Sequence, residues 1–260
     1  MMALITINIH DRHVAVLTLN RPEAANALSK ALLDELNEAV NEINQNKSIY
    51  CTVITGAGEK AFCAGADLKE RKGMSEEEVI KAVRYIGETA NAIEAMNMPV
   101  IAAMNGAAYG GGLELALSCD IRIAAKDIKL GLTETSLAII PGAGGTQRLP
   151  RLVRSGHAKR LIFTAKPIEA SEAITIGLVE QTAKQADLLT EALVMAKTIA
   201  SNGPIALKQA KIAINKGAQT DIKQGVDIER ACYAETIPTA DRLEGLQAFK
   251  EKRKPIYKGI

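Results

Sequence analysis

Two glutamates follow glycine-containing segments and could form an acid/base site. Glu114 ends the run GGGLE at residues 110–114, and Glu134 ends GLTE at 131–134. Small or apolar residues surround Glu114, and the apolar run LAII at 137–140 follows Glu134, so burying either carboxylate would be costly without a purpose. Two acids in one dry cleft titrate as a coupled pair with a raised pKa, which suits proton transfer near neutral pH without a metal. A lone glutamate is more often a solvated surface group, and this is the alternative for Glu114 and for Glu134 when each is considered separately.

Two stretches of small residues could supply backbone hydrogen-bond donors beside these acids. One is AFCAGADLK at 61–69, and the other is the glycine run 110–112 at a predicted helix N-terminus. Small side chains leave amide N–H groups accessible, and a helix N-terminus adds partial positive charge that favours an oxyanion. Together the two stretches could polarise a carbonyl group. The alternative is that each is a tight turn in which glycine only relieves backbone strain.

Motifs for other chemistry are absent from the sequence. The segment GAGGTQ at 142–147 lacks the final glycine of a dinucleotide-binding fingerprint, and neither a phosphate-binding P-loop nor a GxSxG elbow occurs. His10, His13 and His157 show no metal-ligand spacing. We therefore expect no metal and no separate cofactor.

Composition bounds the class of protein. The chain has 260 residues, 47% of them hydrophobic, which is enough for a sizeable core, and a formal charge of +2 gives little support for binding nucleic acid or a membrane surface. The four cysteines show neither zinc-site spacing nor the density of a disulfide framework, which favours a reducing cytoplasm. Residues 1–6 lack the pattern of a signal peptide, and no apolar run is long enough to span a bilayer, so we expect an untargeted protein.

Alternating strands and helices must position the candidate groups. Hydrophobic periodicity and turn residues predict strands at 4–9, 14–19, 50–55, 100–104 and 121–124. Helices are predicted from the cap Ser29, from the capping box at 75–78 to about residue 96, and over 110–118. Further helical patterns cover 157–163, 170–176, 188–201, 204–215, 221–237 and 241–252. We expect a core over 1–195 and a helical region over 196–260 that belongs to the same structural unit and packs on the core or on a neighbouring subunit.

Three of these segments resemble, in the same order, motifs of the crotonase (enoyl-CoA hydratase/isomerase) superfamily. They are residues 62–69, 105–114 and 140–148, and the likeness extends from residue 19 to the C-terminus. The resemblance implies an α/β fold in which a spiral of ββα units forms two nearly perpendicular sheets. A C-terminal helical region that builds trimers, usually paired into hexamers, would follow.

The resemblance also implies roles for the candidate residues. The amides of Ala66 and Gly111 would hold the thioester oxygen, Glu134 would exchange a proton with the substrate α-carbon, and Glu114 would orient and deprotonate the water. An enoyl-CoA hydratase, which adds water across the 2,3 double bond, is the function that two acids favour. Isomerisation or another reaction of a CoA thioester is the alternative.

A CoA-binding surface is implied as well. Its expected members are Lys60, Ala64, Asp67, Leu68, Lys69, Phe249 and Lys252, the last two from the C-terminal segment of this or a neighbouring subunit. The lysines could equally be ordinary surface residues, and Phe249 could belong to the core. Glu23 departs from the family pattern, because many hydratases have a phosphate-contacting lysine there.

Within the superfamily, the likeness is greatest to the 3-methylglutaconyl-CoA hydratases. It rests on residues 63–71, 112–117 and the tail 231–253, and it suggests a branched substrate from leucine breakdown, although straight-chain 2-enoyl-CoAs fit equally well. Part of that subgroup binds RNA through lysines at every fourth position of the first helix. Here Lys30 is followed by Asp34 and Glu38, which repel phosphate, so RNA binding is not expected. A CoA-binding scaffold without catalysis is a further alternative.

Overall fold

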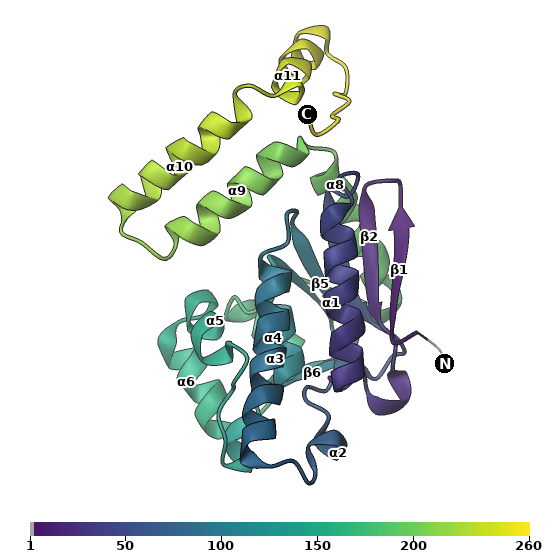
Figure 1. Ribbon diagram of the computed structural model, residues 1–260, viewed down its shortest axis with the longest axis vertical. Helices are drawn as coiled ribbons and strands as arrows, with labels where there is room; N and C mark the ends of the chain where they lie inside the picture. Colours follow the sequence, from purple (N-terminus) through teal and green to yellow (C-terminus); the bar gives the residue numbers. More distant parts are fainter. Residues whose placement is uncertain (1–2) are drawn as a thin grey trace.

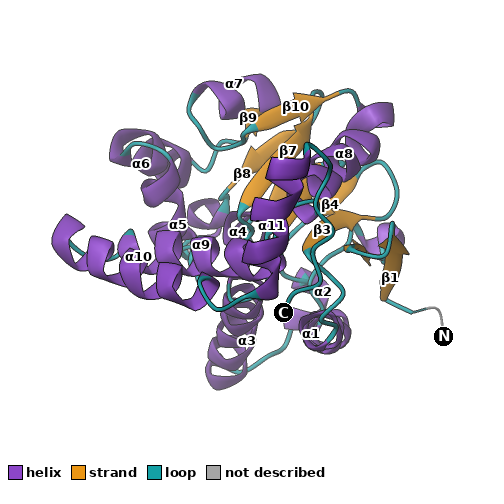
Figure 2. Ribbon diagram, turned by 90° about the horizontal axis from the view of Figure 1, so that it is seen from above, coloured by secondary structure: helices purple, strands orange, loops and turns teal. Residues whose placement is uncertain are grey.

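Two β-sheets form the centre of the chain, and helices surround them (Figures 1 and 2). The computed structural model describes residues 3–260. The first sheet has six strands in the order β1-β2-β3-β5-β7-β10. Their bounds are Ile5–His10, Val14–Leu19, Cys51–Gly56, Val100–Met104, Ile121–Ala125 and Gln181–Ala183. The hairpin β1-β2 is antiparallel, as predicted, and every later pair in this sheet is parallel.

The second sheet is smaller and repeats the strand order of the first. Its strands are β4 (Ala61–Cys63), β6 (Ala107–Tyr109), β8 (Lys129–Gly131) and β9 (Ile168–Glu169). Each of β3, β5 and β7 in the first sheet is followed directly by β4, β6 or β8 in the second. The chain therefore advances along both sheets together, which is the predicted spiral of ββα units.

Eleven α-helices and three short 3₁₀ helices complete the described part of the chain. The α-helices are α1 (Lys30–Gln45), α2 (Leu68–Arg71), α3 (Glu76–Glu94), α4 (Gly111–Ser118), α5 (Gly145–Leu152), α6 (Ser155–Thr164), α7 (Ala170–Thr175), α8 (Leu188–Ala200), α9 (Pro204–Gly217), α10 (Ile222–Thr236) and α11 (Ala240–Glu251). The 3₁₀ helices are η1 (Pro22–Ala24), η2 (Glu134–Leu137) and η3 (Gln185–Asp187).

Caps read from the sequence start two of the long helices. The Ser29 side chain accepts a hydrogen bond from the Leu32 amide at the start of α1. The predicted capping box opens α3, where Ser75 and Glu78 each accept a hydrogen bond from the other residue's backbone amide. These bonds satisfy amides that have no partner within the helix. Both starts therefore agree with the prediction.

Helix α4 lies at the centre of the molecule. All eight of its residues are buried, in keeping with a segment whose polar side chains are only Glu114 and Ser118. A Cβ atom on Gly112 would lie only 2.1 Å from the carbonyl oxygen of Cys63. Because glycine permits this approach, the N-terminus of α4 lies against the backbone that follows β4.

Several short elements were not predicted. The strands β4, β6, β8, β9 and β10 contain only two or three residues, too few to show an alternating pattern. Helix α5 starts among glycines and has Pro150 inside it, two features that argue against a helix in a sequence. Tertiary pairing overrides local preference at these places.

The C-terminal helices make a separate layer at one end of the molecule (Figure 1). Helices α9 and α10 pack on each other, and the main core cluster ends at Ala196. Helix α9 has no buried residue, and α10 has only Cys232. The boundary between residues 195 and 196 stays a prediction.

Within residues 3–260, no helix combines the length and apolar character needed to cross a membrane. The sequence predicts no signal peptide in residues 1–6, and the first two of these, Met1 and Met2, lie outside the described residues.

Replacing Gly112 by alanine should destabilise the fold. The added methyl group would overlap the Cys63 carbonyl, and overpacking of this kind typically lowers the free energy of unfolding by about 1–3 kcal/mol. The same change at Gly156 in α6, where an added Cβ meets no atom within 4 Å, should be neutral or stabilise by up to about 1 kcal/mol. Urea unfolding of both variants checks this, and equal stabilities would contradict it.

Candidate active site

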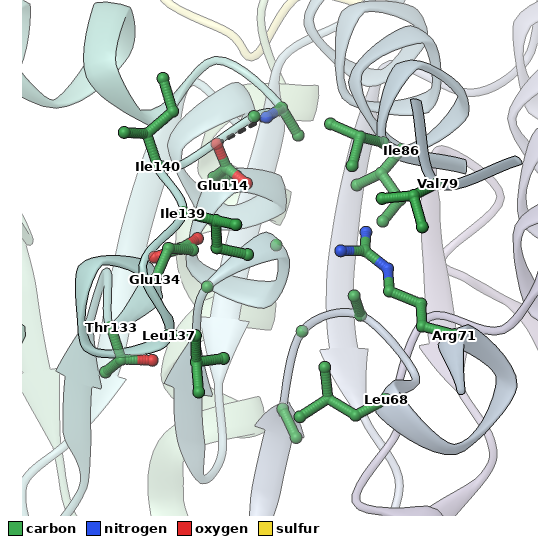
Figure 3. Close-up of a pocket in the computed structure, with 18 of the residues that line it drawn as sticks. Leu68, Arg71, Val79, Ile86, Glu114, Thr133, Glu134, Leu137, Ile139 and Ile140 are labelled. Atoms are coloured by element: carbon green, nitrogen blue, oxygen red, sulfur yellow. Dashed lines mark hydrogen bonds between the residues drawn. The ribbon is translucent and has the colours of Figure 1, made fainter. Parts of the chain in front are cut away.

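A pocket with a volume of about 550 Å³ opens beside the N-terminus of α4 (Figure 3). Helices α2 and α3 form one wall, and η2 with the loop at 138–143 forms the other. Most of the lining is glycine or apolar side chain, and the charged groups are Arg71, Glu114 and Glu134. An apolar cavity with a few convergent polar groups is the usual form of a small-molecule site.

The pocket lies where three strands of the second sheet end. Ala66 follows β4, Gly111 follows β6 and Glu134 follows β8. These strands are adjacent and parallel, so the segments after them leave the sheet at the same edge. The topology thus gathers residues that are far apart in the sequence, as parallel sheets commonly do at their carboxyl ends.

Glu114 is held firmly by the backbone. Its side chain projects from α4, the residue is 3% exposed, and its Oε1 accepts hydrogen bonds from the amides of Ala143 at 2.8 Å and Gly145 at 2.7 Å. Burial raises the pKa of this carboxyl group, and the hydrogen bonds from the two amides oppose the rise because they stabilise the charged form. The carboxylate therefore has a fixed position and one oxygen left for a ligand.

Arg148 anchors the loop that holds Glu114. Its Nη1 donates to the carbonyl oxygen of Ala143 at 3.0 Å, and its Nη2 donates to Asn91 and to Glu94, each at 2.7 Å. Asn91 and Glu94 belong to α3, so the guanidinium group links that helix to the loop. Arg148 was part of a predicted motif but had no predicted role.

Glu134 lies beside Glu114 in the same cavity, across from Arg71 (Figure 3). Its Oε2 is buried and has no hydrogen-bond partner within residues 3–260. Burial is the main reason that its pKa rises to about 7, and the nearby charge of Glu114 raises it further while Arg71 acts in the opposite direction. A carboxyl group with this pKa exchanges protons readily near neutral pH.

Two backbone amides lie side by side in the pocket. Leu28 forms a parallel bridge with Ala66: the Leu28 amide donates a hydrogen bond to the Gly65 carbonyl oxygen, and the Leu28 carbonyl oxygen accepts one from the Asp67 amide. In this arrangement the N–H of Ala66 itself points away from Leu28. Gly111 is the first residue of α4, and a Cβ built on it would lie 3.7 Å from the Ala66 nitrogen. In the part of the chain that the structure describes, neither amide has an acceptor. The pair can therefore hold one oxygen atom of a ligand.

Comparison with known proteins identifies the family. The family model described as enoyl-CoA hydratase/isomerase matches residues 10–259.

The chain belongs to the enoyl-CoA hydratase/isomerase family.

Relatives and a solved structure agree with this assignment. A putative enoyl-CoA hydratase/isomerase of Bacillus subtilis is 56% identical over 98% of both chains. The human mitochondrial methylglutaconyl-CoA hydratase is 49% identical over 96% of this chain and 75% of its own. A crystal structure of an enoyl-CoA hydratase from Bacillus anthracis superposes with a TM-score of 0.97 at 54% identity, over 99% of this chain and 100% of that one. The predicted superfamily, its fold class and the expectation of an enzyme are confirmed.

Only some of the predicted CoA-binding residues line the pocket. Ala64 and Leu68 line it, and Lys60 and Lys69 are exposed outside its lining. The Asp67 side chain is already engaged, because it pairs with Arg21 at 2.6 Å and caps α2 by accepting from the amides of Lys69 and Glu70. A direct side-chain contact of Asp67 with CoA would compete with these bonds.

The two C-terminal residues of the predicted CoA surface lie elsewhere in this chain. Phe249 is 87% exposed on α11, and Lys252 follows that helix, whereas no residue of α9 to α11 lines the pocket. Figure 1 shows α11 at the opposite end of the molecule from α2. Phe249 is therefore not a core residue, and the pair could reach a CoA site only in another subunit.

The apolar residues after Glu134 differ from their expected role. The sequence predicts an environment poor in solvating partners for Glu134, but Leu137 is 56% exposed, Ile139 47% and Ile140 69%. All three line the pocket. They form an apolar wall that a bound acyl chain can cover, which also explains why Glu134 is only partly buried.

Arg71 is a pocket residue for which no role was predicted. It ends α2 and directs its guanidinium group into the cavity toward the two glutamates (Figure 3). Burial lowers the pKa of Arg71, and the charges of Glu114 and Glu134 partly restore it. The signal that could have revealed it is spacing, because Arg71 lies three residues after Leu68 and so shares its face of a helix.

Replacing Glu134 by glutamine should stabilise the fold at high pH only. The folded-state pKa near 7 exceeds the ordinary value of 4.5, so the wild-type protein loses stability as the pH rises through that window, whereas the amide variant does not. At pH 8 the variant should melt about 2–4 °C higher, the shift expected for about 1 kcal/mol in a chain of this size.

Melting curves at pH 5 and pH 8 test this expectation. Glutamine at the exposed Glu59 is the matched control and should show no such pH dependence. A difference between wild type and the Glu134 variant that is the same at both pH values would show that the carboxyl group is not desolvated.

Proposed function

We propose that this chain adds water across the 2,3 double bond of a 2-enoyl-CoA thioester. The observation that carries the proposal is the meeting of Glu114, Glu134 and the free amides of Ala66 and Gly111 in one pocket. Acids and amide donors together match the two demands of conjugate hydration, proton transfer and stabilisation of an enolate.

The amide pair supports the first demand. When the water oxygen bonds to C3, an electron pair moves to the thioester oxygen, which becomes an enolate. The amides of Ala66 and Gly111 would donate to that oxygen, and the start of α4 adds the partial positive charge of a helix N-terminus. A preorganised donor of this kind contributes about 3 kcal/mol of transition-state stabilisation.

The glutamates support the second demand with different environments. Glu114 has its charged form stabilised by two amides, so it would take a proton from the water. Glu134 has a pKa of about 7 and would give its proton to C2 as the enolate collapses. After the reaction Glu114 holds one proton and Glu134 lacks one, and proton exchange through solvent restores the pair.

CoA itself would be bound at the mouth of the pocket as part of the substrate, with no separate cofactor. Ala64 and Leu68 at the lining support this position, and the exposed Lys60, directly before β4, and Lys69, on α2, would bind the phosphates. Phe249 and Lys252 would contribute from a neighbouring subunit. Glu23 is an exposed acid on η1 and would repel the diphosphate, so cations elsewhere would have to bind it.

Two substrate classes are consistent with the relatives. The human relative is named a methylglutaconyl-CoA hydratase, and the Bacillus anthracis protein is named an enoyl-CoA hydratase. We propose that the chain accepts both a branched acidic substrate and straight-chain 2-enoyl-CoAs. Steady-state rates with crotonyl-CoA and 3-methylglutaconyl-CoA decide the preference, and a tenfold ratio corresponds to about 1.4 kcal/mol.

The alternative from another class, RNA binding, receives no support from the first helix. Lys30 is paired with Asp34 at 2.7 Å, and Asp34 also accepts from the Tyr85 hydroxyl at the same distance. The one lysine of the expected stripe is thus neutralised by an acid. A mobility shift of RNA by the protein at physiological salt would contradict this conclusion.

We also propose that the chain assembles through its C-terminal helices. Exposed apolar side chains gather there, with Ile222 84%, Leu246 60% and Phe249 87% exposed. Only Cys232 of helices α9 and α10 is fully buried within the chain, so a neighbouring subunit would be needed to cover their exposed side chains. Sedimentation should show a trimer or hexamer, and a monomer at micromolar concentration would contradict this.

A reducing compartment such as the cytoplasm is proposed on the cysteines. All four are unpaired and buried, and burial raises the pKa of Cys51, Cys63 and Cys119 to about 12. Thiols of this kind are unreactive structural residues. Trapping a disulfide in protein taken directly from cells would contradict the proposal.

Glutamine at either Glu114 or Glu134 should abolish most turnover of crotonyl-CoA. Each change removes one proton-transfer group, so kcat should fall by about 10²- to 10⁴-fold. The dissociation constant of the unreactive butyryl-CoA should change little, because CoA contacts are retained. Glutamine at Glu59 is the control, and full turnover by either active-site variant would remove the mechanism.

A further inference from the structure

Arg71 is the only cation that lines the pocket, among residues 3–260, and the proposed reaction has not used it. Its neighbours along the pocket wall are Leu68 on α2 and the apolar side chains of Val79, Val83 and Ile86 on α3. A charged group beside apolar side chains is costly unless an anion compensates it. The position of Arg71 therefore requires an explanation.

The two catalytic carboxylates do not provide a close partner. Glu114 and Glu134 act on Arg71 through their charge, but no hydrogen bond of the guanidinium group to either contributes to its pKa. Glu114 is already held by the amides of Ala143 and Gly145. The five N–H donors of the guanidinium group thus stay available.

The acids of the neighbouring cavity also have partners other than Arg71. A second cavity of about 440 Å³ lies between α1 and α3, shares Arg71 with the pocket, and contains four carboxylates. Each has another partner: Asp34 pairs with Lys30, Asp67 with Arg21, Glu70 accepts from the Lys30 amide, and Glu78 accepts from the Ser75 amide. None of these acids forms a hydrogen bond or an ion pair with Arg71 in the described chain.

The surroundings favour an anion on the acyl group over the phosphates of CoA. Arg71 is half-buried, faces the catalytic acids, and is flanked by residues that suit a hydrocarbon chain. The exposed lysines Lys60 and Lys69 lie outside the lining, where hydrated phosphates would be less costly to bind. A carboxylate carried by the acyl chain is the anion that can reach this depth.

We infer that Arg71 determines specificity by binding a carboxylate at the end of the acyl chain. The preferred substrates are then 2-enoyl-CoAs with an acidic acyl group, an inference that rests on the proposed hydration. Guanidinium and carboxylate groups form two parallel hydrogen bonds, which fixes the chain as well as attracting it. The same contact would offset the cost of leaving Arg71 in an apolar wall.

The test compares two substrates of equal carbon number. Glutaconyl-CoA ends in a carboxylate, and 2-pentenoyl-CoA ends in a methyl group. Replacing Arg71 by methionine should lower the ratio of their kcat/KM values by about 10- to 100-fold, the range for one charge-assisted contact. Lysine at this position should give an intermediate ratio, because it cannot form the two parallel bonds.

Methionine at Lys72 is the matched control, since Lys72 is the next residue, is exposed and lines neither cavity. It should leave the ratio unchanged. If the ratio of kcat/KM values in Arg71→Met equals the ratio in wild type, the inference is overturned. An equal loss on both substrates also overturns it, because Arg71 would then act on the glutamates or on CoA.

Binding of saturated analogues separates this inference from the proposed function. Calorimetry should show that glutaryl-CoA binds more tightly than pentanoyl-CoA in wild type and loses that advantage in Arg71→Met. If wild type hydrates neither substrate but keeps this difference in binding, hydration is wrong and the role of Arg71 stands. If the two analogues bind equally to wild type, the role of Arg71 is wrong whatever the activity.

Discussion

The buried carboxylate of Glu114 is the constraint on which the rest of the site depends. Removing a charge from water is costly, and here only the amides of Ala143 and Gly145 compensate directly. The loop must therefore approach α4 closely, and a Cβ on Gly145 would come within 2.9 Å of Oε1. Arg148 holds the same loop to α3, whose apolar face is a wall of the pocket. One hydrogen-bonded carboxylate thus fixes a loop, a helix and a cavity.

Close backbone packing provides the remaining geometry. Three adjacent parallel strands end at one edge of the second sheet and deliver Ala66, Gly111 and Glu134 to a single pocket. The approach of α4 to the segment after β4 requires glycine at Gly112 and at Gly65, which has a φ of +91° and where a Cβ would lie 2.7 Å from the Tyr109 carbonyl oxygen. Glycine in these segments brings two amides together, which is a positioning role as well as a relief of strain.

The sequence predicts the long elements well because they carry local signals. Apolar spacing together with the caps Ser29 and Ser75 locates α1 and α3, and the glycine-containing motifs locate the acids and amides of the site. Strands of two or three residues have no periodicity, so β4, β6 and β8 emerge only from pairing within the sheet. The contacts of Arg71 and Arg148 depend on side-chain directions set by tertiary packing. For the same reason the sequence predicts that residues 137–140 are an apolar environment for Glu134, but not that they form an exposed wall of the pocket.

Convergence of the two glutamates is the central claim, and an NMR titration of ¹³C-labelled glutamate side chains tests it most directly. One carboxyl resonance should titrate near pH 7 and disappear in Glu134→Gln. Its apparent pKa should fall in Glu114→Gln, because the neighbouring negative charge that raises it is then absent. A titration of Glu134 that is unchanged by the Glu114 substitution would show that the two acids do not share one site, and the account would be wrong.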